Sequence, residues 1–431
     1  MTNRRDALAA RREAMGFTQE SFAIRLNVEL STVGRWERGT LTPQPWRRPR
    51  IAAALGVSLE QLNELLTGST TVSPGRPQTA MPQVESASRF DHALVVGDAR
   101  DAARFAHHIN ATRISSGALD QISIEVRRFA TDYVSQPLSE LFVDIRELRG
   151  AVVRLMENNR FPIQMRELYL AAGRLSGLQA HICLDLGHYR AAHTHADTAF
   201  LCAELAGHNG MQAWVRGLQS LIAYWDGQLA DAVEFARDGV RYCSKGSIAA
   251  RLPSLEARAC AIRGDTHGAL AALASAEQAR ARIETEDDDA GVFTFPSAKQ
   301  AVYAGTTLLA LGNRATAVRA ARESSYALRL YQAAPPADRS TGDMLAARLD
   351  LGRAYLIQDD LDGLAEQLRF VLVTPQVRRT ASIVKRAAGI GENITCSRYA
   401  HSPQARQIRM EITSFCAPPP ALPPAPHAEA T

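Results

Sequence analysis

A stretch near the N-terminus, Phe17 to Gly39, concentrates side chains that can hydrogen-bond to nucleic acid. Its sequence, FTQESFAIRLNVELSTVGRWERG, predicts two short helices joined by a tight turn. The second helix would direct Ser31, Arg35 and Arg38 outward, and Ser31 and Arg35 share one face because they are four residues apart. The stretch is therefore either a DNA-reading element or a small hairpin in a protein that is almost entirely helical.

Five short helices are predicted across residues 4–68, and several have clear start signals. Thr18 is placed to cap the second helix. Asn27 falls at the turn between the second and third helices, where a left-handed backbone is needed and Asn tolerates it. Ser58 and Gln61 form a capping box that opens the last helix. The region also holds ten Arg against seven acidic residues, a net charge of +3.

This pattern resembles the Cro/repressor or XRE-type helix-turn-helix family over about residues 4–68. The agreement lies in the segments GFTQESFAIRL, STVGRWERG and IAAALGVSLEQL. In that family an Arg on the first helix pairs with the Glu that ends the third, and the matching residues are Arg12 and Glu37. Two positions depart from the family: Asn27 replaces the usual Gly, and Gly34 interrupts the third helix at a cost of ~1 kcal/mol relative to Ala.

The resemblance implies binding to double-stranded DNA, with the third helix in the major groove. The positions facing the bases would be Leu30, Ser31, Thr32 and Arg35. Arg35 can pair bidentately with a guanine edge, worth ~1–3 kcal/mol of discrimination. Gln19 would touch phosphate or buttress the third helix. Further side chains around the groove suit phosphates: Arg38, Thr40, Thr42, Arg47 and Arg48.

Composition and linkers divide the 431 residues into four parts. We predict a DNA-binding domain at 1–68, a flexible linker at 69–89, a helical-repeat domain at 90–416 and a disordered Pro-rich tail at 417–431. No run approaches the ~18 apolar residues needed to span a bilayer, so no membrane partner is expected. Without a secretory signal, the six widely spaced cysteines are expected to be reduced thiols. The expected location is the cytoplasm, with the nucleoid as the location when DNA is bound.

The long C-terminal region contains an internal repeat of helical pairs. Five segments share a helix, a short turn with Gly or Asp, and a second helix with an Ala-rich face. They align on Ala192, Ala232, Ala269, Ala317 and Leu364, with spacings of 40, 37, 48 and 47 residues. A single pair cannot bury its apolar face alone, so the pairs are expected to stack into a solenoid with a concave surface.

These units resemble tetratricopeptide-type repeats, whose period is about 34 residues. The best match is Leu351, Gly352 and Tyr355, where the glycine would let two helices approach closely. The expected fold class is therefore all-α: a five-helix helix-turn-helix domain followed by an α-solenoid of tetratricopeptide-like helical pairs.

The resemblance also implies which residues line the concave face, namely those early on the first helix of each pair. Cations and aromatics there would suit a peptide carboxylate or another acidic ligand. A register shift of one residue would change the set. The predicted residues are Arg174, His181, Arg251, Arg258, Lys299 and Arg353, with Trp214, Tyr224 and Trp225 nearby.

Catalytic, cofactor and metal motifs are not expected to define this protein. The sequence has no P-loop, no HExxH and no nucleophile elbow, so an enzyme, catalytic residues and a cofactor are not predicted. His181, His188 and His195 recur every seven residues, about 10 Å per step along a helix, and cannot converge on one metal ion.

The whole arrangement resembles actinobacterial XRE-type regulators with tetratricopeptide-like C-terminal domains. More distantly, its layout is similar to the peptide-sensing regulators of Gram-positive quorum systems. It implies a transcriptional regulator that acts as a homodimer, with a peptide, small ligand or protein partner sensed by the repeats. The alternative is an interaction scaffold whose N-terminal domain serves assembly rather than DNA readout.

Overall fold

The computed structural model describes residues 5–67, 101–102, 104, 114–134, 136–243, 246–283 and 291–417. The predicted linker at 69–89 lies outside these residues, as does the predicted tail from 418 onward. The chain divides into two compact units, Met1–Ala93 and Leu94–Thr431. Throughout the described residues both units are built from helices and contain no strand, which confirms the predicted all-α class.

The first unit contains the five predicted helices. A single 3₁₀ turn, η1 (Pro45–Arg47), precedes the fourth. The helices are α1 (Asp6–Ala14), α2 (Gln19–Leu26), α3 (Leu30–Glu37), α4 (Arg48–Leu55) and α5 (Leu59–Thr67).

Local signals fix the ends of these helices. The Thr18 side chain caps α2 by accepting a hydrogen bond from the Ser21 backbone N–H. Asn27 ends α2 with φ 52° and ψ 57°, the left-handed conformation predicted for the turn into α3. The capping box is present in both directions, since Ser58 and Gln61 each donate a backbone N–H to the other's side chain.

A small apolar core and one buried ion pair hold the first unit together. Val33 and Trp36 point inward from α3 and are 1% and 3% exposed. Arg12 on α1 pairs with Glu37 at the end of α3, with Nε and Oε1 2.6 Å apart and both residues buried. The predicted Arg12–Glu37 pair is thus present, and it links the first helix to the end of α3.

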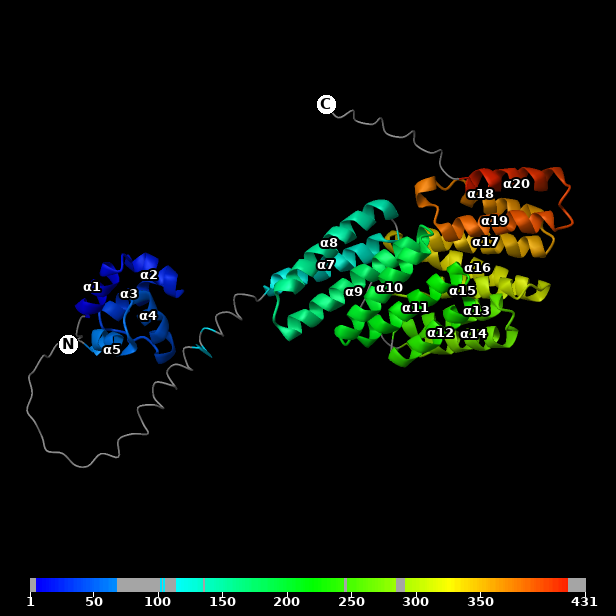
Figure 1. Cartoon of the computed structure of the whole chain (residues 1–431). Helices are drawn as coiled ribbons and strands as arrows, with labels where there is room; N and C mark the ends of the chain where they lie inside the picture. Colours follow the sequence, from blue (N-terminus) through cyan, green and yellow to red (C-terminus); the bar gives the residue numbers. More distant parts are fainter. Residues whose placement is uncertain are drawn as a thin grey trace, which may run out of the picture. The chain divides into compact units, whose positions relative to one another are not determined.

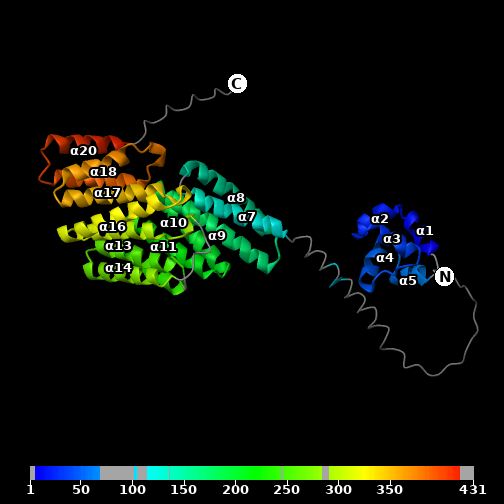
Figure 2. The same cartoon turned by 180° about the vertical axis from the view of Figure 1, so that it is seen from behind.

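The second unit consists of helices that pair along the chain (Figures 1 and 2). Two long helices, α7 (Ser116–Asp132) and α8 (Leu138–Asn158), come first. The pairs are α9 (Pro162–Asp185) with α10 (Tyr189–Leu205), α11 (Asn209–Asp226) with α12 (Leu229–Gly239), α13 (Ile248–Ile262) with α14 (Thr266–Ala281), α15 (Ser297–Ala310) with α16 (Arg314–Ala333), α17 (Thr341–Ile357) with α18 (Leu361–Leu372), and α19 (Ala381–Thr395) with α20 (Pro403–Cys416). Short 3₁₀ turns lie between some of them: η2 (Val240–Tyr242), η3 (Gly291–Phe293), η4 (Pro336–Asp338) and η5 (Gln376–Arg378).

The positions on which the predicted repeats align are buried where the two helices of each pair meet. The five alignment positions, from Ala192 to Leu364, are all 0% exposed and lie near the start of the second helix of their pair. A Cβ added at Gly352 would come within 2.9 Å of the Leu364 side chain. Small residues at these crossings therefore set how closely the two helices of a pair approach.

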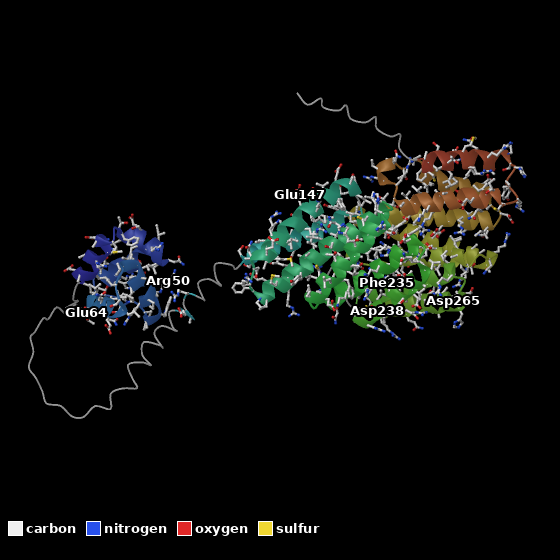
Figure 3. The ribbon with its side chains drawn as sticks, viewed as in Figure 1. Arg50, Glu64, Glu147, Phe235, Asp238 and Asp265 are labelled. Atoms are coloured by element: carbon white, nitrogen blue, oxygen red, sulfur yellow. The ribbon has the colours of Figure 1, made fainter. Side chains whose placement is uncertain are left out.

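Polar contacts between the two helices of a pair supplement this apolar packing. Phe235 and Asp238 project from α12 (Figure 3), and Asp238 forms an ion pair with Arg216 of α11 at 2.7 Å. The Arg216 guanidinium also lies 5.6 Å from the Phe235 ring centroid. Such contacts tie neighbouring helices together at the surface, where the apolar core ends.

We call the first helices of the six pairs the inner helices. The row of inner helices is curved, so that the inner helix of the last pair, α19, lies against that of the first pair, α9. α19 contacts α9, and the Lys385 ammonium donates a hydrogen bond of 2.9 Å to the carbonyl of Trp225 at the end of α11. A Cβ at Gly187, just after α9, would lie 3.3 Å from the Cβ of Ala381. The inner helices therefore enclose space, rather than lining an open trough along their whole length.

Candidate functional site

The outward face of α3 carries the predicted base-reading side chains. Leu30, Ser31 and Arg35 are exposed, and Thr32 is half-buried. α3 runs unbroken from Leu30 to Glu37, so Gly34 does not interrupt it as expected from the sequence. A Cβ at Gly34 would lie 3.0 Å from the Arg38 guanidinium, which shows that Arg38 folds back along α3.

Gln19 supports α3 from the start of α2. Its side-chain amide donates a hydrogen bond to Glu37, the same carboxylate that pairs with Arg12. Of the two roles predicted for Gln19, the structure therefore displays the buttress. Because Glu37 is held by both α1 and α2, the orientation of α3 is fixed before any ligand is bound.

Beside α3, Thr32 and Arg47 line a hollow together with Thr42. Arg47 is half-buried, and its guanidinium lies 4.4 Å from the ring centroid of the exposed Trp46. Thr40 donates its hydroxyl to the Arg35 carbonyl at 3.2 Å. The structure thus brings together predicted residues from α3, the following loop and η1.

Arg48 differs from the other predicted phosphate contacts. Its guanidinium donates to the Pro43 carbonyl and to the Asn63 side chain, each at 3.1 Å. Arg48 therefore joins the loop after α3 to α5, and a phosphate would have to compete with both partners. Its assignment as a DNA contact remains a prediction.

Sequence reasoning missed Arg5, which holds the end of α3. Its guanidinium donates to the Leu41 carbonyl at 2.9 Å and to the Thr42 hydroxyl at 2.8 Å. Its backbone N–H donates to the Glu37 carbonyl at 2.7 Å. No local pattern in the sequence indicates these contacts, because the partners lie more than 30 residues away.

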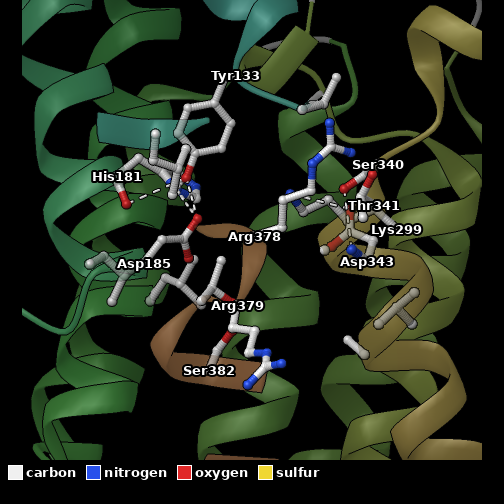
Figure 4. Close-up of a pocket in the computed structure, with 18 of the residues that line it drawn as sticks. Tyr133, His181, Asp185, Lys299, Ser340, Thr341, Asp343, Arg378, Arg379 and Ser382 are labelled. Carbon is white, nitrogen blue, oxygen red and sulfur yellow. Dashed lines mark hydrogen bonds and ion pairs between the residues drawn. The ribbon is translucent and has the colours of Figure 1, made fainter. Parts of the chain in front are cut away.

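In the second unit, the inner helices surround a cavity that we call the central pocket. It encloses about 1080 Å³ of empty space, part of it open to solvent. Figure 4 shows Tyr133, His181 and Asp185 on one wall, and Lys299 and Asp343 among the residues of the opposite wall. Each inner helix contributes at least one lining residue: His181, Trp225, Arg258, Lys299, Asp343 and Arg386.

One wall carries a hydrogen-bonded network of Tyr133, His181 and Asp185. The Tyr133 hydroxyl donates to the Asp185 carboxylate and lies 2.6 Å from His181 Nδ1. Since that hydroxyl has a single proton, His181 is assigned as the donor to the tyrosine oxygen, with its proton on Nδ1. Burial, aided by Lys299 and Arg251, lowers the pKa of His181 well below its usual value, so the ring is neutral at pH 7.

The opposite wall carries an ion pair. Lys299 Nζ lies 3.7 Å from Asp343 Oδ2, and the Tyr331 hydroxyl donates to the same carboxylate at 2.8 Å. Burial is the largest single influence on the pKa of Lys299 and lowers it, but Asp343, Tyr303 and Asp185 together outweigh burial, and the pKa is raised. Lys299 is therefore a permanent cation in the pocket at physiological pH.

The structure separates the predicted ligand residues into three groups. His181 and Arg258 line the central pocket, as do Lys299 and Trp225. Tyr224 and Arg353 line a neighbouring pocket that shares Trp225 and Arg386 with the central one.

The third group is a correction: Trp214 and Arg251 are core residues rather than groove residues. They are 2% and 3% exposed. The segment that begins with η3 covers Trp214, because the Trp214 ring meets Phe293 edge to face with centroids 4.8 Å apart and its indole N–H donates to the Val292 carbonyl. Arg251 in turn donates to the Trp214 carbonyl. Arg174 lies over the same ring, with its guanidinium 5.8 Å from the Phe293 centroid. A loop segment from later in the chain therefore fills the part of the concave face where these residues were expected to bind ligand.

Several lining residues were not predicted: Tyr133, Asp185, Tyr303, Asp343 and Arg386. Two of them could have been found from the sequence. Asp185 and Tyr303 lie four residues after the predicted His181 and Lys299, and so share a helix face with them. No sequence pattern indicated Tyr133 or Arg386, because α7 and α19 come to lie beside the pocket only through the curvature of the whole unit.

Replacing Asp185 by asparagine is expected to stabilise the second unit above pH 6. Burial raises the pKa of Asp185 from 3.8 to about 6, although the hydrogen bond from Tyr133 and the charge of Lys299 lower it. A carboxyl group with a raised pKa in the folded state contributes most stability below its unfolded pKa, and that contribution is lost as pH rises through 6. At pH 7 the variant should gain ~1–3 kcal/mol.

Urea unfolding of both proteins between pH 4 and pH 8 measures this effect. The gap between the two free energies of unfolding should widen from pH 4 to pH 6 and stay constant above pH 7. A gap that does not change with pH would show that Asp185 titrates normally in the folded protein.

Metal and membrane sites were sought as well. Among the residues that the structure describes, no group of three or more His, Cys, Asp or Glu side chains is placed to hold a metal ion. None of the described helices combines the length and the apolar character needed to cross a bilayer.

Comparison with known protein families assigns the first unit. Residues 5–75 match the family model of a helix-turn-helix domain. Comparisons with curated proteins and with solved structures give no match. The N-terminal unit is thus a helix-turn-helix domain, followed by a helical repeat-like region.

Proposed function

We propose that this protein is a sequence-specific DNA-binding transcriptional regulator whose second unit binds an effector. The observation that carries the proposal is the exposed face of α3 on a helix-turn-helix domain whose third helix is held rigidly by Glu37. Leu30, Ser31 and Arg35 project from that face. In such domains this helix enters the major groove, and residues near its N-terminus reach the base edges.

The finer assignment is to XRE-type regulators with tetratricopeptide-like repeats, of the kind found in actinobacteria. It is supported by the pairwise packing of α9 to α20 and by the buried repeat positions from Ala192 to Leu364. In this proposal the central pocket is the sensor, and binding there adjusts DNA affinity. The pocket is assigned to binding and not to catalysis.

We also propose that the protein binds DNA as a homodimer. A single helix-turn-helix unit buries little surface on DNA and binds with modest specificity, and two units on a near-palindromic site overcome both limits. Half-sites should then lie about 10–10.5 base pairs apart, or a multiple of this spacing. Light scattering of the full chain, alone and with operator DNA, gives the number of protomers in each state.

Arg35→Ala is expected to lower affinity for the selected operator about 10- to 100-fold, while nonspecific binding changes little. This follows from losing one bidentate base contact worth ~1–3 kcal/mol. The operator is first obtained by selecting random duplexes with the full chain, and affinities are then measured by fluorescence anisotropy at one fixed salt concentration.

Arg25→Ala provides the matched control, because Arg25 is an exposed arginine on α2 outside the predicted contact set. It should reduce affinity for all sequences slightly and equally. If Arg35→Ala and Ser31→Ala together leave operator specificity intact, α3 does not read the bases. If the full chain selects no sequence at all, the scaffold alternative replaces the regulator.

A further inference from the structure

Arg258 on α13 is a buried cation for which the described residues supply no anion. It is 2% exposed and lines the central pocket. Its guanidinium lies 4.4 Å from the ring centroid of Tyr224 and 4.3 Å from that of Tyr303. Its Nε has no hydrogen-bond partner, and no carboxylate of the described residues pairs with it. An uncompensated buried charge is costly, so arginines in protein interiors are ordinarily paired.

The carboxylates that face the central pocket are already engaged elsewhere. Asp185 accepts the hydroxyl proton of Tyr133, and Asp343 binds Tyr331 and Lys299. Five cationic side chains share the lining with these two carboxylates: Arg258, Lys299, Arg378, Arg379 and Arg386. Lys299 is paired with Asp343, and Arg386 with Asp350, whereas no carboxylate of the described residues pairs with Arg258, Arg378 or Arg379. These three arginines give the lining an excess of positive charge.

Arg251, on the same helix as Arg258, is a buried arginine whose hydrogen-bond acceptor comes from the protein itself. It is also buried and also lies over a ring, 5.1 Å from the Trp214 centroid. Unlike Arg258, it donates a hydrogen bond of 2.8 Å to the Trp214 carbonyl, and it does not line the central pocket. The two residues differ in whether the protein itself supplies an acceptor.

The rest of the pocket sets the size and character of its occupant. Leu184, Leu221 and Val302 contribute apolar surface, and the Trp225 ring adds a flat wall. The cavity is partly open to solvent, and it combines apolar walls with a few polar and charged groups, as small-molecule sites do. An extended peptide would need more of the inner face, where Phe293 and Phe295 of the same chain are buried.

We propose that Arg258 is the anion-binding residue of the central pocket, and that the pocket takes a small organic acid. The carboxylate or phosphate group of the acid accepts hydrogen bonds from the Arg258 guanidinium, which is suited to bidentate contact with either group. The apolar body of the acid lies against Trp225, Leu221 and Val302. This assignment rests on the proposed function only in treating the pocket as the sensor, and its test uses no DNA.

The test is calorimetric titration of the full chain with acids and their uncharged counterparts. Octanoate and phenylacetate represent carboxylates, phenyl phosphate represents phosphates, and octanamide and phenylacetamide are the neutral matches, each used up to 20 mM. At least one acid should bind at least about tenfold more tightly than its neutral match, because charge-assisted hydrogen bonds are the stronger ones. The carboxylate and phosphate arms identify the acid group that the pocket prefers.

Arg258→Met should abolish this binding and leave the melting temperature of the ligand-free protein unchanged or higher, because it removes an uncompensated buried charge. Arg258→Lys keeps the charge without the planar fork and should bind more weakly than the native protein. Arg251→Met is the matched control, and should lower the melting temperature but retain the response to acids.

Three results would overturn the proposal. One is that no acid binds more tightly than its amide. A second is that Arg258→Met binds acids as the native protein does. The third is that Arg258→Met melts as early as Arg251→Met, which would make Arg258 a core residue. Failure of operator selection with acid binding intact would instead refute only the regulatory role.

Discussion

Replacing Arg12 by methionine is expected to unfold the helix-turn-helix domain. Arg12 and Glu37 are 5% and 8% exposed, so the variant leaves a carboxylate buried with Gln19 as its remaining side-chain partner. Removing one member of a buried ion pair typically costs ~3–5 kcal/mol. A domain of this size has a total stability of only ~3–9 kcal/mol. DNA binding should therefore be lost together with the helical signal of the first unit.

Two further variants separate the buried charge from other causes. Glu13→Gln removes the other carboxylate near Arg12, whose side chain is 69% exposed, and should cost less than ~1 kcal/mol. Arg12→Met combined with Glu37→Leu removes both charges and should recover part of the lost stability. Urea unfolding followed by circular dichroism measures all three. Equal losses for Arg12→Met and Glu13→Gln would mean that the pair contributes little.

Replacing Arg386 by methionine is expected to destabilise the second unit by ~3–5 kcal/mol. Arg386 on α19 pairs with Asp350 on α17, which is 4% exposed, and donates to the Thr306 hydroxyl on α15 at 3.2 Å. Thr306 in turn donates to Asp350 at 2.7 Å. The pair thus joins three inner helices, and the variant would leave Asp350 with the Thr306 hydroxyl as its remaining side-chain partner.

Arg237→Met is the matched control for this prediction. Arg237 pairs with Glu256 at 2.6 Å, but its side chain is 60% exposed, so solvent screens the interaction. Its loss should cost less than ~1 kcal/mol. Chemical denaturation monitored by tryptophan fluorescence compares the two variants. A loss for Arg386→Met no larger than that for Arg237→Met would show that the curl of the unit does not depend on this pair.

The helices and caps of the first unit could be predicted because their signals are local. The Thr18 cap, the left-handed Asn27 and the Ser58–Gln61 box each involve residues within a few positions of one another. Arg12 and Glu37 are 25 residues apart, and only the resemblance to a known family joined them in advance. Arg5 has no such guide, and its role in holding the end of α3 was missed.

Only part of the predicted ligand set lies around a pocket, and the reason is similar. The register carried over from tetratricopeptide-like repeats placed His181 and Arg258 on the concave face, and both line the central pocket. The same reasoning placed Trp214 and Arg251 on an open face, yet Val292 and Phe293 cover Trp214, and Arg251 is buried against Trp214. A repeat register indicates which face is turned inward, but not the distant segment that packs on it.

Local patterns along the chain were thus enough to predict the helices, their ends, the register of the pairs and the helix-turn-helix domain. Three features follow from the folded second unit alone: α19 contacts α9, η3 fills part of the inner face, and Arg258 has no carboxylate partner among the described residues. The curvature of the unit is the sum of small rotations between successive pairs, and no single repeat encodes that sum. That curvature decides which side chains of the other inner helices face Arg258, and so whether Arg258 has a carboxylate partner.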